Sequence, residues 1–186
     1  MLEIEMKFPV ADFAPVEAKL AQWQARPAEI LHEADHYYNS PDRDFAKTDE
    51  ALRLRRIGET NIVTYKGPKQ AGPAKTRTEV EVGIEPGAEA ADKFCQLLTH
   101  LGYRAVAVVR KTRRPYGFKR RDFALEACLD EVEQLGRYVE VEIVAPEEKK
   151  TEAQEVLAQV ASELGLANPE RRSYLELYLK AVGRLD

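Results

Sequence analysis

The sequence predicts an α+β fold in a single domain, residues 1–186, with about eight antiparallel strands and four helices. Most apolar residues alternate with polar ones, which is typical of strands that bury one face. Between these segments, apolar residues recur every three or four positions, as they do on helices packed against a core. The 186 residues are enough for one domain with a substantial hydrophobic core.

Eight segments carry the alternating strand pattern, and several of them are bounded by Gly, Pro, Asn or Asp. They are residues 2–8, 35–39, 51–57, 61–67, 77–84, 108–116, 123–132 and 137–144. This number of antiparallel strands can close into a barrel, with helices covering its apolar outer face. The Gly- and Pro-rich residues 67–75 between two strands predict an exposed hairpin loop.

Four segments carry the helical pattern. They are residues 16–25, 89–101, 147–164 and 170–182. Pro15 precedes the first, and Gly102 and Gly165 follow the second and third, which are ordinary start and stop signals.

Composition excludes several classes of protein. The net charge of −4 gives no general attraction for nucleic acid, and Trp23 lies in a helix and not on a strand as a base-stacking platform would. The longest aliphatic run, residues 105–109, is too short to span a bilayer, and the first residues carry no apolar signal region. Cys95 and Cys128 make no disulfide framework. We expect a soluble cytoplasmic protein with reduced thiols and no nucleic-acid or membrane partner; the composition leaves a homodimer open.

The segment His32–His36 reads HEADH and matches the H-E-x-x-H pattern of zinc hydrolases. That pattern makes a zinc site only on a helix. Here two tyrosines follow and Asn-Ser-Pro ends the segment, which favours a strand. We therefore expect a strand that contains two histidines and assign no role to His32 or His36.

A second pattern, Gly67 to Gly72, begins like a phosphate-binding P-loop. Pro73 and Ala74 follow where Lys and Ser or Thr are needed, and the next segment is a strand rather than a helix. The sequence therefore contains no P-loop.

Charged residues on the predicted strands are segregated by strand. Residues at i and i+2 of a strand point to the same face. Carboxylates occupy that face on the first and last strands, and cations occupy it on the third, fourth and sixth. A solvated sheet face is the simple alternative, because antiparallel sheets often have one side in water. Arginines at i and i+2, however, suit two-point recognition of an oxyanion.

A barrel interior lined with both signs of charge is costly unless the charges are paired or bind a ligand. Carboxylates would hold hard cations such as Mg²⁺ or Mn²⁺, which share ligands with substrate phosphates. Arginines and lysines would hold the remaining phosphate oxygens. The pattern therefore predicts a small-molecule polyphosphate ligand with divalent cations.

These residues also resemble a known family. E-I-E-M-K at residues 3–7 is similar to the E-x-E-x-K signature of the CYTH superfamily, the triphosphate tunnel metalloenzymes. Further similar segments follow in family order: DHYYN, LRLR, TYKGP, RTEVE, RKTRRPY, LDEVEQLGRYVEVEI and SYLELY. The resemblance covers nearly the whole chain, and TYKGP and SYLELY are most similar to the class IV adenylate cyclase branch.

The resemblance implies an eight-stranded antiparallel β-barrel or tunnel with a charged interior and helices packed outside. It implies metal ligands at Glu3, Glu5, Asp130, Glu140 and Glu142. It implies triphosphate binding by Lys7, Arg53, Arg55, Lys66, Arg77, Lys111 and Arg113, with Glu79 and Glu81 in supporting roles. Lys7 and Glu5 would be the catalytic pair, Glu5 as a metal ligand and Lys7 as a group that activates or orients the nucleophile.

Three functions remain open at this point. The first is a cyclase that converts ATP to cyclic AMP and pyrophosphate. The second is a triphosphatase acting on tripolyphosphate, thiamine triphosphate or a nucleoside triphosphate. The third is a non-catalytic polyphosphate- or nucleotide-binding module. The many carboxylates favour an enzyme over a simple binder, because a binder needs cations more than metal ligands.

Overall fold

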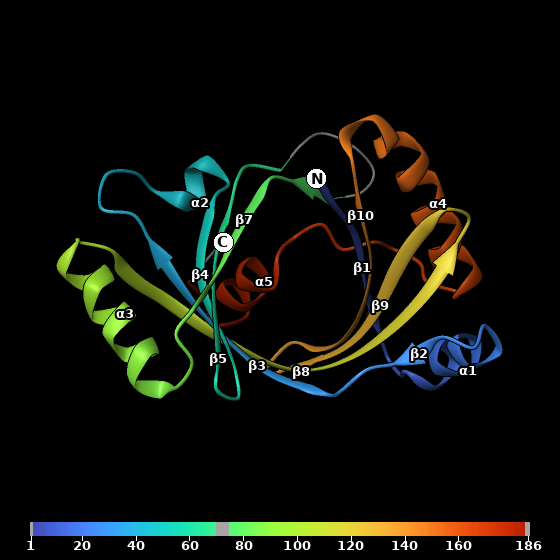
Figure 1. Ribbon diagram of the computed structural model, residues 1–186, viewed down its shortest axis with the longest axis horizontal. Helices are drawn as coiled ribbons and strands as arrows, with labels where there is room; N and C mark the ends of the chain where they lie inside the picture. The colour runs from blue at the N-terminus through green and yellow to red at the C-terminus, as the bar shows by residue number, and fades with distance from the viewer. Residues whose placement is uncertain (1, 70–74, 185–186) are drawn as a thin grey trace.

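The computed structural model describes residues 2–69 and 75–184, and its centre is one curled antiparallel sheet (Figure 1). The strands are β1 (Leu2–Val10), β2 (Arg26–Pro27), β3 (Leu31–Asn39), β4 (Ala51–Ile57), β5 (Thr60–Lys66), β6 (Lys75–Arg77), β7 (Glu79–Ile84), β8 (Arg104–Arg120), β9 (Phe123–Val132) and β10 (Gly136–Ala145). The helices are α1 (Ala14–Gln22), α2 (Phe45–Thr48), α3 (Ala88–His100), α4 (Lys150–Glu163) and α5 (Tyr174–Ala181), with a 3-10 turn at Glu147–Lys149.

The strand order is β6-β1-β10-β9-β8-β3-β4-β5-β7, and the two-residue β2 pairs with β8 off this path. β6 pairs with β1 and β7 pairs with β5, yet only Thr78 separates β6 from β7 in the chain. The two ends of the sheet are therefore joined by one kinked strand. Counting β6 and β7 together and leaving out β2 gives the eight predicted strands, so the fold prediction is confirmed.

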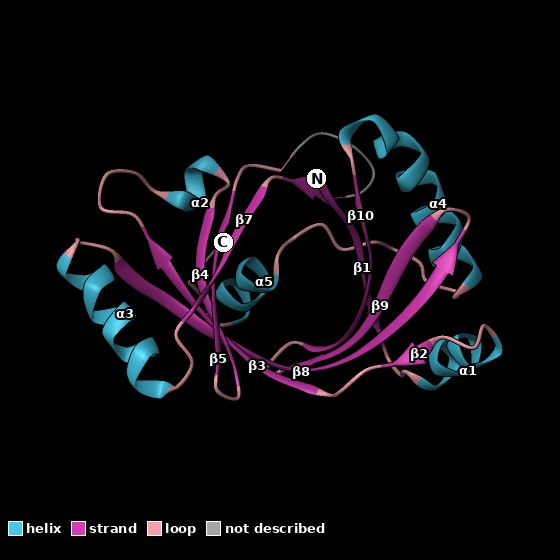
Figure 2. Ribbon diagram, viewed as in Figure 1, coloured by secondary structure: helices cyan, strands magenta, loops and turns pink. Residues whose placement is uncertain are grey.

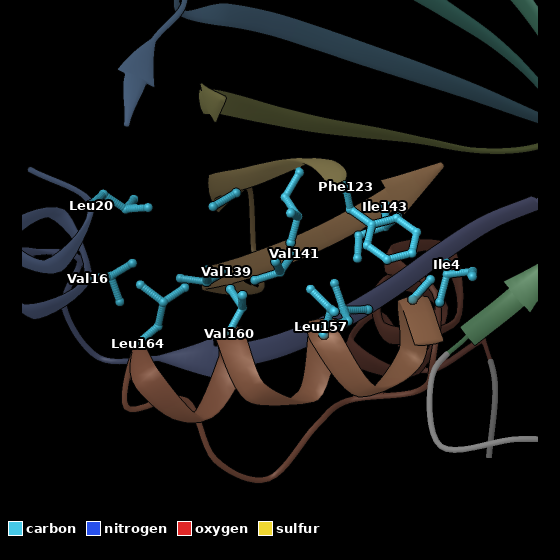
Figure 3. Close-up of a cluster of buried hydrophobic side chains, with 14 of the residues drawn as sticks. Ile4, Val16, Leu20, Phe123, Val139, Val141, Ile143, Leu157, Val160 and Leu164 are labelled. Carbon is cyan, nitrogen blue, oxygen red and sulfur yellow. The ribbon is translucent and has the colours of Figure 1, made fainter. Parts of the chain in front are cut away.

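The outer face of the curled sheet packs against helices because the alternation places one apolar set there. α4 and α1 cover β1, β9 and β10 through a cluster that includes Ile4, Leu20, Val141 and Leu157, all fully buried (Figure 3). α3 covers a second cluster around Leu54 and Leu98. On β1 and β10, polar residues such as Glu3, Glu5 and Glu142 alternate with these outer-core residues and line the concave side.

α5 differs from the predicted outer position, because it lies on the concave side of the sheet (Figure 2). Its Tyr174 and Leu177 pack in a third cluster with Tyr37, Val109 and Tyr138. Ser173 caps the helix by accepting a hydrogen bond from the backbone N–H of Glu176, whose carboxylate accepts one from the N–H of Ser173. Amphipathicity predicted which face of α5 is apolar, but not on which side of the sheet it packs.

The HEADH segment lies within β3, so the strand prediction is confirmed. On a strand, two histidines four positions apart are separated by roughly 13 Å, too far to share a zinc ion. The predicted hairpin loop at 67–75 falls partly on residues 70–74, outside the described residues, and a strand follows it as expected. Among the described residues, no helix is long and apolar enough to cross a membrane.

Candidate functional site

The concave side of the sheet encloses a cavity of about 460 Å³ that contains nearly all the predicted site residues. Its lining includes Glu3, Glu5, Lys7, Arg53, Arg55, Lys66, Arg77, Glu79, Glu81, Lys111, Arg113, Glu140 and Glu142. Strand alternation explains this, because Leu2 and Ile4 enter the outer core while Glu3 and Glu5 point inward. Of the predicted site residues, only Asp130 does not line the cavity.

The cavity wall formed by β3, β4 and β8 contains cations with carboxylates of its own. Asp35 accepts hydrogen bonds from Arg55 Nε at 2.7 Å and Arg55 Nη2 at 2.8 Å, and Arg53 Nη1 lies 3.5 Å from it. Glu33 lies 2.9 Å from Arg55 and 3.1 Å from Lys111. Burial alone would raise the pKa of Asp35, but the Arg55 hydrogen bonds and the charges of Arg53 and Arg55 hold it well below its usual range. We call β3, β4 and β8 the paired wall.

Asp130, on the neighbouring strand β9, is the register partner of Arg113 and holds its guanidinium. It accepts hydrogen bonds from Arg113 at 2.8 and 2.6 Å and from the Tyr174 hydroxyl at 2.8 Å. Burial opposes ionisation, yet Lys111 and Arg113 lower the pKa of Asp130 to about 2. Arg113 also donates a hydrogen bond to Glu140. Asp130 is fully buried, and its geometry is that of a residue that positions Arg113.

Tyr174 on α5 also contacts two lysines of the cavity. The Nζ of Lys7 lies 4.1 Å from the ring centroid, and that of Lys111 lies 5.1 Å from it. Lys7 further donates a hydrogen bond to the Arg172 carbonyl at 2.6 Å and lies 4.0 Å from Glu140. An aromatic face, a carbonyl and a carboxylate all stabilise a positive charge, so these contacts suit Lys7 as a cation better than as a base.

A buried donor on the paired wall, the Nε–H of Arg53, lacks an acceptor in the described part of the chain. Arg53 is only 6% exposed and lines the cavity, and its Nη2 donates to Thr64 Oγ1 at 3.1 Å. Its Nε has no hydrogen-bond partner within residues 2–69 and 75–184. Buried N–H groups are rarely left unpaired, because the cost is about 1–3 kcal/mol. A donor of this kind in a cavity indicates an anionic ligand.

The opposite wall, formed by β1, β9 and β10, is rich in carboxylates. The register places Glu5 beside Glu142, and Glu142 beside Glu126, in one row across three strands. Burial, followed by the neighbouring Glu3, Glu140 and Glu126, raises the pKa of Glu142 to about 8. We call β1, β9 and β10 the acidic wall.

Cys128 also lies on the acidic wall, where burial and neighbouring carboxylates disfavour the reactive thiolate form. Its thiol donates to Glu126 at 3.1 Å. Burial and the carboxylates of Glu142, Glu126 and Asp130 raise the pKa of this thiol above its usual value.

The donor set fits a hard divalent cation. Thirteen carboxyl groups but only seven Lys and Arg side chains line the cavity within the described part of the chain, so a bare polyanion would meet a surplus of negative charge. In residues 2–69 and 75–184, no three His, Cys, Asp or Glu side chains already converge on one metal position. Mg²⁺ is commonly held by one or two carboxylates together with substrate phosphates, so an all-protein cage is not required.

The remaining predicted residues lie at one side of the cavity. Lys66 pairs with Glu79, and Glu81 accepts a hydrogen bond from Thr64 at 3.2 Å. Arg77 donates to the carbonyls of Gly67 and Asp49, so its guanidinium also holds two loops together. Burial and the nearby Arg53 lower the pKa of Lys66.

Sequence reasoning missed Glu33, Asp35 and Glu126 as site residues. The signal for the first two was present, because alternation in HEADHYY places Glu33, Asp35 and Tyr37 on one face. The H-E-x-x-H pattern instead indicates the two histidines as candidate functional residues. Glu126 alternates with apolar residues on its strand, but only the strand register shows that it lies beside Glu142.

Comparison with known proteins identifies close relatives. The sequence profile of the CYTH domain matches residues 1–174. A Methanocaldococcus jannaschii protein named "Putative adenylate cyclase MJ0240" is 37% identical over 95% of this chain and 98% of its own length. The structure of PH1819 from Pyrococcus horikoshii OT3 has 39% identity, covers 96% of this chain and 98% of that one, and gives a TM-score of 0.82.

A more distant neighbour shares the fold alone. It is HpAC1 from Hippeastrum, named "Putative adenylyl cyclase" and described as having a dominant triphosphatase activity. It is 18% identical, covers 99% of this chain and 96% of that one, and gives a TM-score of 0.66.

Proposed function

Since the chain belongs to the CYTH family, we propose that it is a divalent-metal-dependent enzyme acting on triphosphates, of the class IV adenylate cyclase type. In this reaction the ribose 3′-hydroxyl of ATP attacks the α-phosphate, forming a new P–O bond. The bond to the β-phosphate breaks, the hydroxyl proton is lost, and cyclic AMP and pyrophosphate are the products. The name carried by the M. jannaschii relative supports this choice of reaction.

The observation that carries the proposal is the pairing of two unlike walls in one cavity. The paired wall presents Arg53 with an unmatched buried N–H, and the acidic wall presents crowded carboxylates with a raised pKa at Glu142. An anion satisfies the first, and a cation satisfies the second. A metal–triphosphate complex supplies both at once.

Glu3, Glu5 and Glu142 would hold Mg²⁺ or Mn²⁺, with Glu126 and Glu140 adjacent. When bound, the metal would neutralise developing charge on the phosphates and lower the pKa of an oxygen nucleophile. Asp130 remains a predicted ligand by resemblance. Its contacts with Arg113 and Tyr174 favour a positioning role.

The protein's own residues would bind and orient the substrate. Arg53, Arg55, Lys111 and Arg113 would donate to phosphate oxygens, and Lys7 would place a fixed positive charge near Glu140. Phosphoryl and nucleotidyl transfer need little covalent chemistry from the protein, so positioning and charge carry most of the catalysis.

A triphosphatase is the second candidate. The same cavity would serve if water were the nucleophile, and the triphosphatase activity described for HpAC1, which shares this fold, makes the reaction worth testing. A binding module without turnover is the third. It is disfavoured by the surplus of carboxyl groups around the cavity.

A product assay separates the three. The purified protein is incubated with Mg²⁺ or Mn²⁺ and, separately, with ATP, tripolyphosphate and thiamine triphosphate, and products are resolved by ³¹P NMR and chromatography. We expect cyclic AMP and pyrophosphate from ATP. Orthophosphate from any substrate without cyclic AMP would establish a triphosphatase. Metal-dependent binding without turnover would overturn the enzyme proposal.

A further inference from the structure

The cavity has an apolar ledge beside its cations, formed by Leu31, Ile57 and Ile62. These residues occupy inward positions on β3, β4 and β5, where the next inward residues are Glu33, Arg55 and Thr64. Strand alternation therefore places three aliphatic side chains on a face that is otherwise polar. Binding phosphate or metal requires none of them.

The ledge takes no part in the hydrophobic core. Other apolar lining residues, such as Tyr37, Val106 and Leu175, pack in the cluster around α5. Leu31, Ile57 and Ile62 belong to none of the three core clusters, and all three are half-buried. Their apolar surface faces the cavity, where covering it would be favourable by about 25 cal/mol per Å².

The ledge borders the cations directly. Leu31 is the register partner of Arg113, and Ile62 is the partner of Arg55. Ile57 is the partner of Glu33, which contacts both Arg55 and Lys111. Directly opposed Cβ atoms in a sheet are roughly 5 Å apart, so the ledge and these charged side chains are nearest neighbours on the cavity wall. A phosphate chain held by these cations thus ends within reach of the ledge.

We infer that the ledge of Leu31, Ile57 and Ile62 receives the nucleoside of a nucleoside triphosphate. The chain would therefore take nucleoside triphosphates in preference to inorganic tripolyphosphate. A nucleobase has two apolar faces and a polar edge, which suits aliphatic side chains next to charged ones. A cavity of about 460 Å³ lies in the range for small-molecule sites. This inference rests on the proposed function and identifies the substrate class of the same cavity.

The test is a double variant, Ile57→Thr with Ile62→Thr. Threonine keeps the β-branched shape that strands favour and replaces the ethyl group of isoleucine with a hydroxyl. The matched control is Val80→Thr with Val82→Thr, at two positions on β7 that are each 55% exposed and outside the cavity lining. kcat/KM is measured with ATP and with tripolyphosphate for each variant in Mg²⁺ and in Mn²⁺.

We expect kcat/KM for ATP to fall about tenfold or more in the ledge variant, because hydrophobic pockets discriminate by this amount. Tripolyphosphate turnover should stay within about twofold of wild type, and the control variant should match wild type with both substrates. Equal losses with both substrates, or no loss with either, would overturn the inference. Turnover of tripolyphosphate but not ATP by the wild type would overturn it too, while leaving a triphosphate enzyme in place.

If the wild type turns over neither substrate, the enzyme proposal fails and the ledge is tested by binding. Calorimetry with Mg²⁺ and a non-hydrolysable ATP analogue is then compared with calorimetry using tripolyphosphate. A loss of affinity in the ledge variant for the analogue alone supports the inference. Equal affinity of the two proteins for the analogue, or no binding of it by wild type, contradicts the inference.

Discussion

The two walls of the cavity hold charge in different ways. On the paired wall, Asp35 and Glu33 satisfy Arg55 and Lys111 within the folded chain. On the acidic wall, Glu142 stands between Glu5 and Glu126 in the strand register and has a raised pKa. The first arrangement fixes cations in place before a ligand arrives. In the second arrangement, neighbouring carboxylates repel one another, and a bound cation would relieve this repulsion.

This difference indicates that the paired wall stabilises the fold and that the acidic wall is available for ligand binding. Breaking a buried ion pair leaves an uncompensated charge and is strongly destabilising. Removing one carboxylate from a crowded group relieves repulsion instead. Equivalent substitutions on the two walls should therefore have opposite effects on stability.

The largest effect should follow from Asp35→Asn on the paired wall. This change removes the charge that two arginines share, and we expect the free energy of unfolding to fall by about 3 kcal/mol. Urea denaturation followed by circular dichroism measures it. Glu89→Gln is the control, because its ion pair with Lys93 is exposed and should contribute about 0.5 kcal/mol or less. An unchanged midpoint for Asp35→Asn would mean that the wall is not held by this carboxylate.

On the acidic wall, Glu5→Gln should abolish most turnover while the fold persists. Removing a metal ligand costs several kcal/mol of transition-state stabilisation, so we expect a loss of about a hundredfold or more. Initial rates across a Mg²⁺ and Mn²⁺ titration measure it, with thermal unfolding as the check on folding. Glu81→Gln, in a supporting position beside Thr64, should lose much less. Full activity and unchanged metal dependence in Glu5→Gln would remove Glu5 from the metal site.

Most of the residues on the two walls could be predicted from the sequence, because the two-residue period of a strand determines which side chains share a face. The inward positions of Glu3, Glu5, Arg53, Arg55 and Glu142 follow directly from it. The eight strands follow from the same pattern.

Which charges meet across the sheet was not predictable, because register and curvature are long-range properties. Alternation places Asp130 inward, but only the structure shows Arg113 and Tyr174 covering it. The ion pair of Glu33 with Lys111 joins residues nearly eighty positions apart. In the same way, amphipathicity could not reveal that α5 packs on the concave side.

The acidic wall should also make stability depend on pH. The ordinary pKa of Glu142 is 4.5, and the folded value is about 8, so the folded state binds an extra proton between these limits. Its contribution is present below about pH 4.5 and is lost as pH rises through 8. We expect the Tm of the metal-free protein to fall by about 10 °C between pH 5 and 8.

Glu142→Gln should flatten this decline, since the variant has no proton to lose. Scanning calorimetry across the pH series, for wild type and variant in EDTA, gives the comparison. Added Mg²⁺ should stabilise wild type more at pH 8 than at pH 5, because metal binding displaces the proton. If the Tm of the two proteins changed with pH in parallel, the carboxylates of the acidic wall would not raise the pKa of Glu142.

The smallest effect on activity should come from Tyr174→Phe, which tests whether α5 helps to hold the cations of the paired wall. The variant keeps the ring beside Lys7 and Lys111 and loses only the hydroxyl that donates to Asp130. A hydrogen bond to a buried carboxylate is worth about 1.5–3 kcal/mol, so unfolding should become easier by that order. Because Asp130 also holds Arg113, we expect KM for ATP to rise a few-fold with kcat nearly unchanged. Tyr174→Leu, which removes the ring as well, should raise KM further. If both variants instead lower kcat alone, α5 acts on the chemical step, and the paired wall does not extend beyond the sheet.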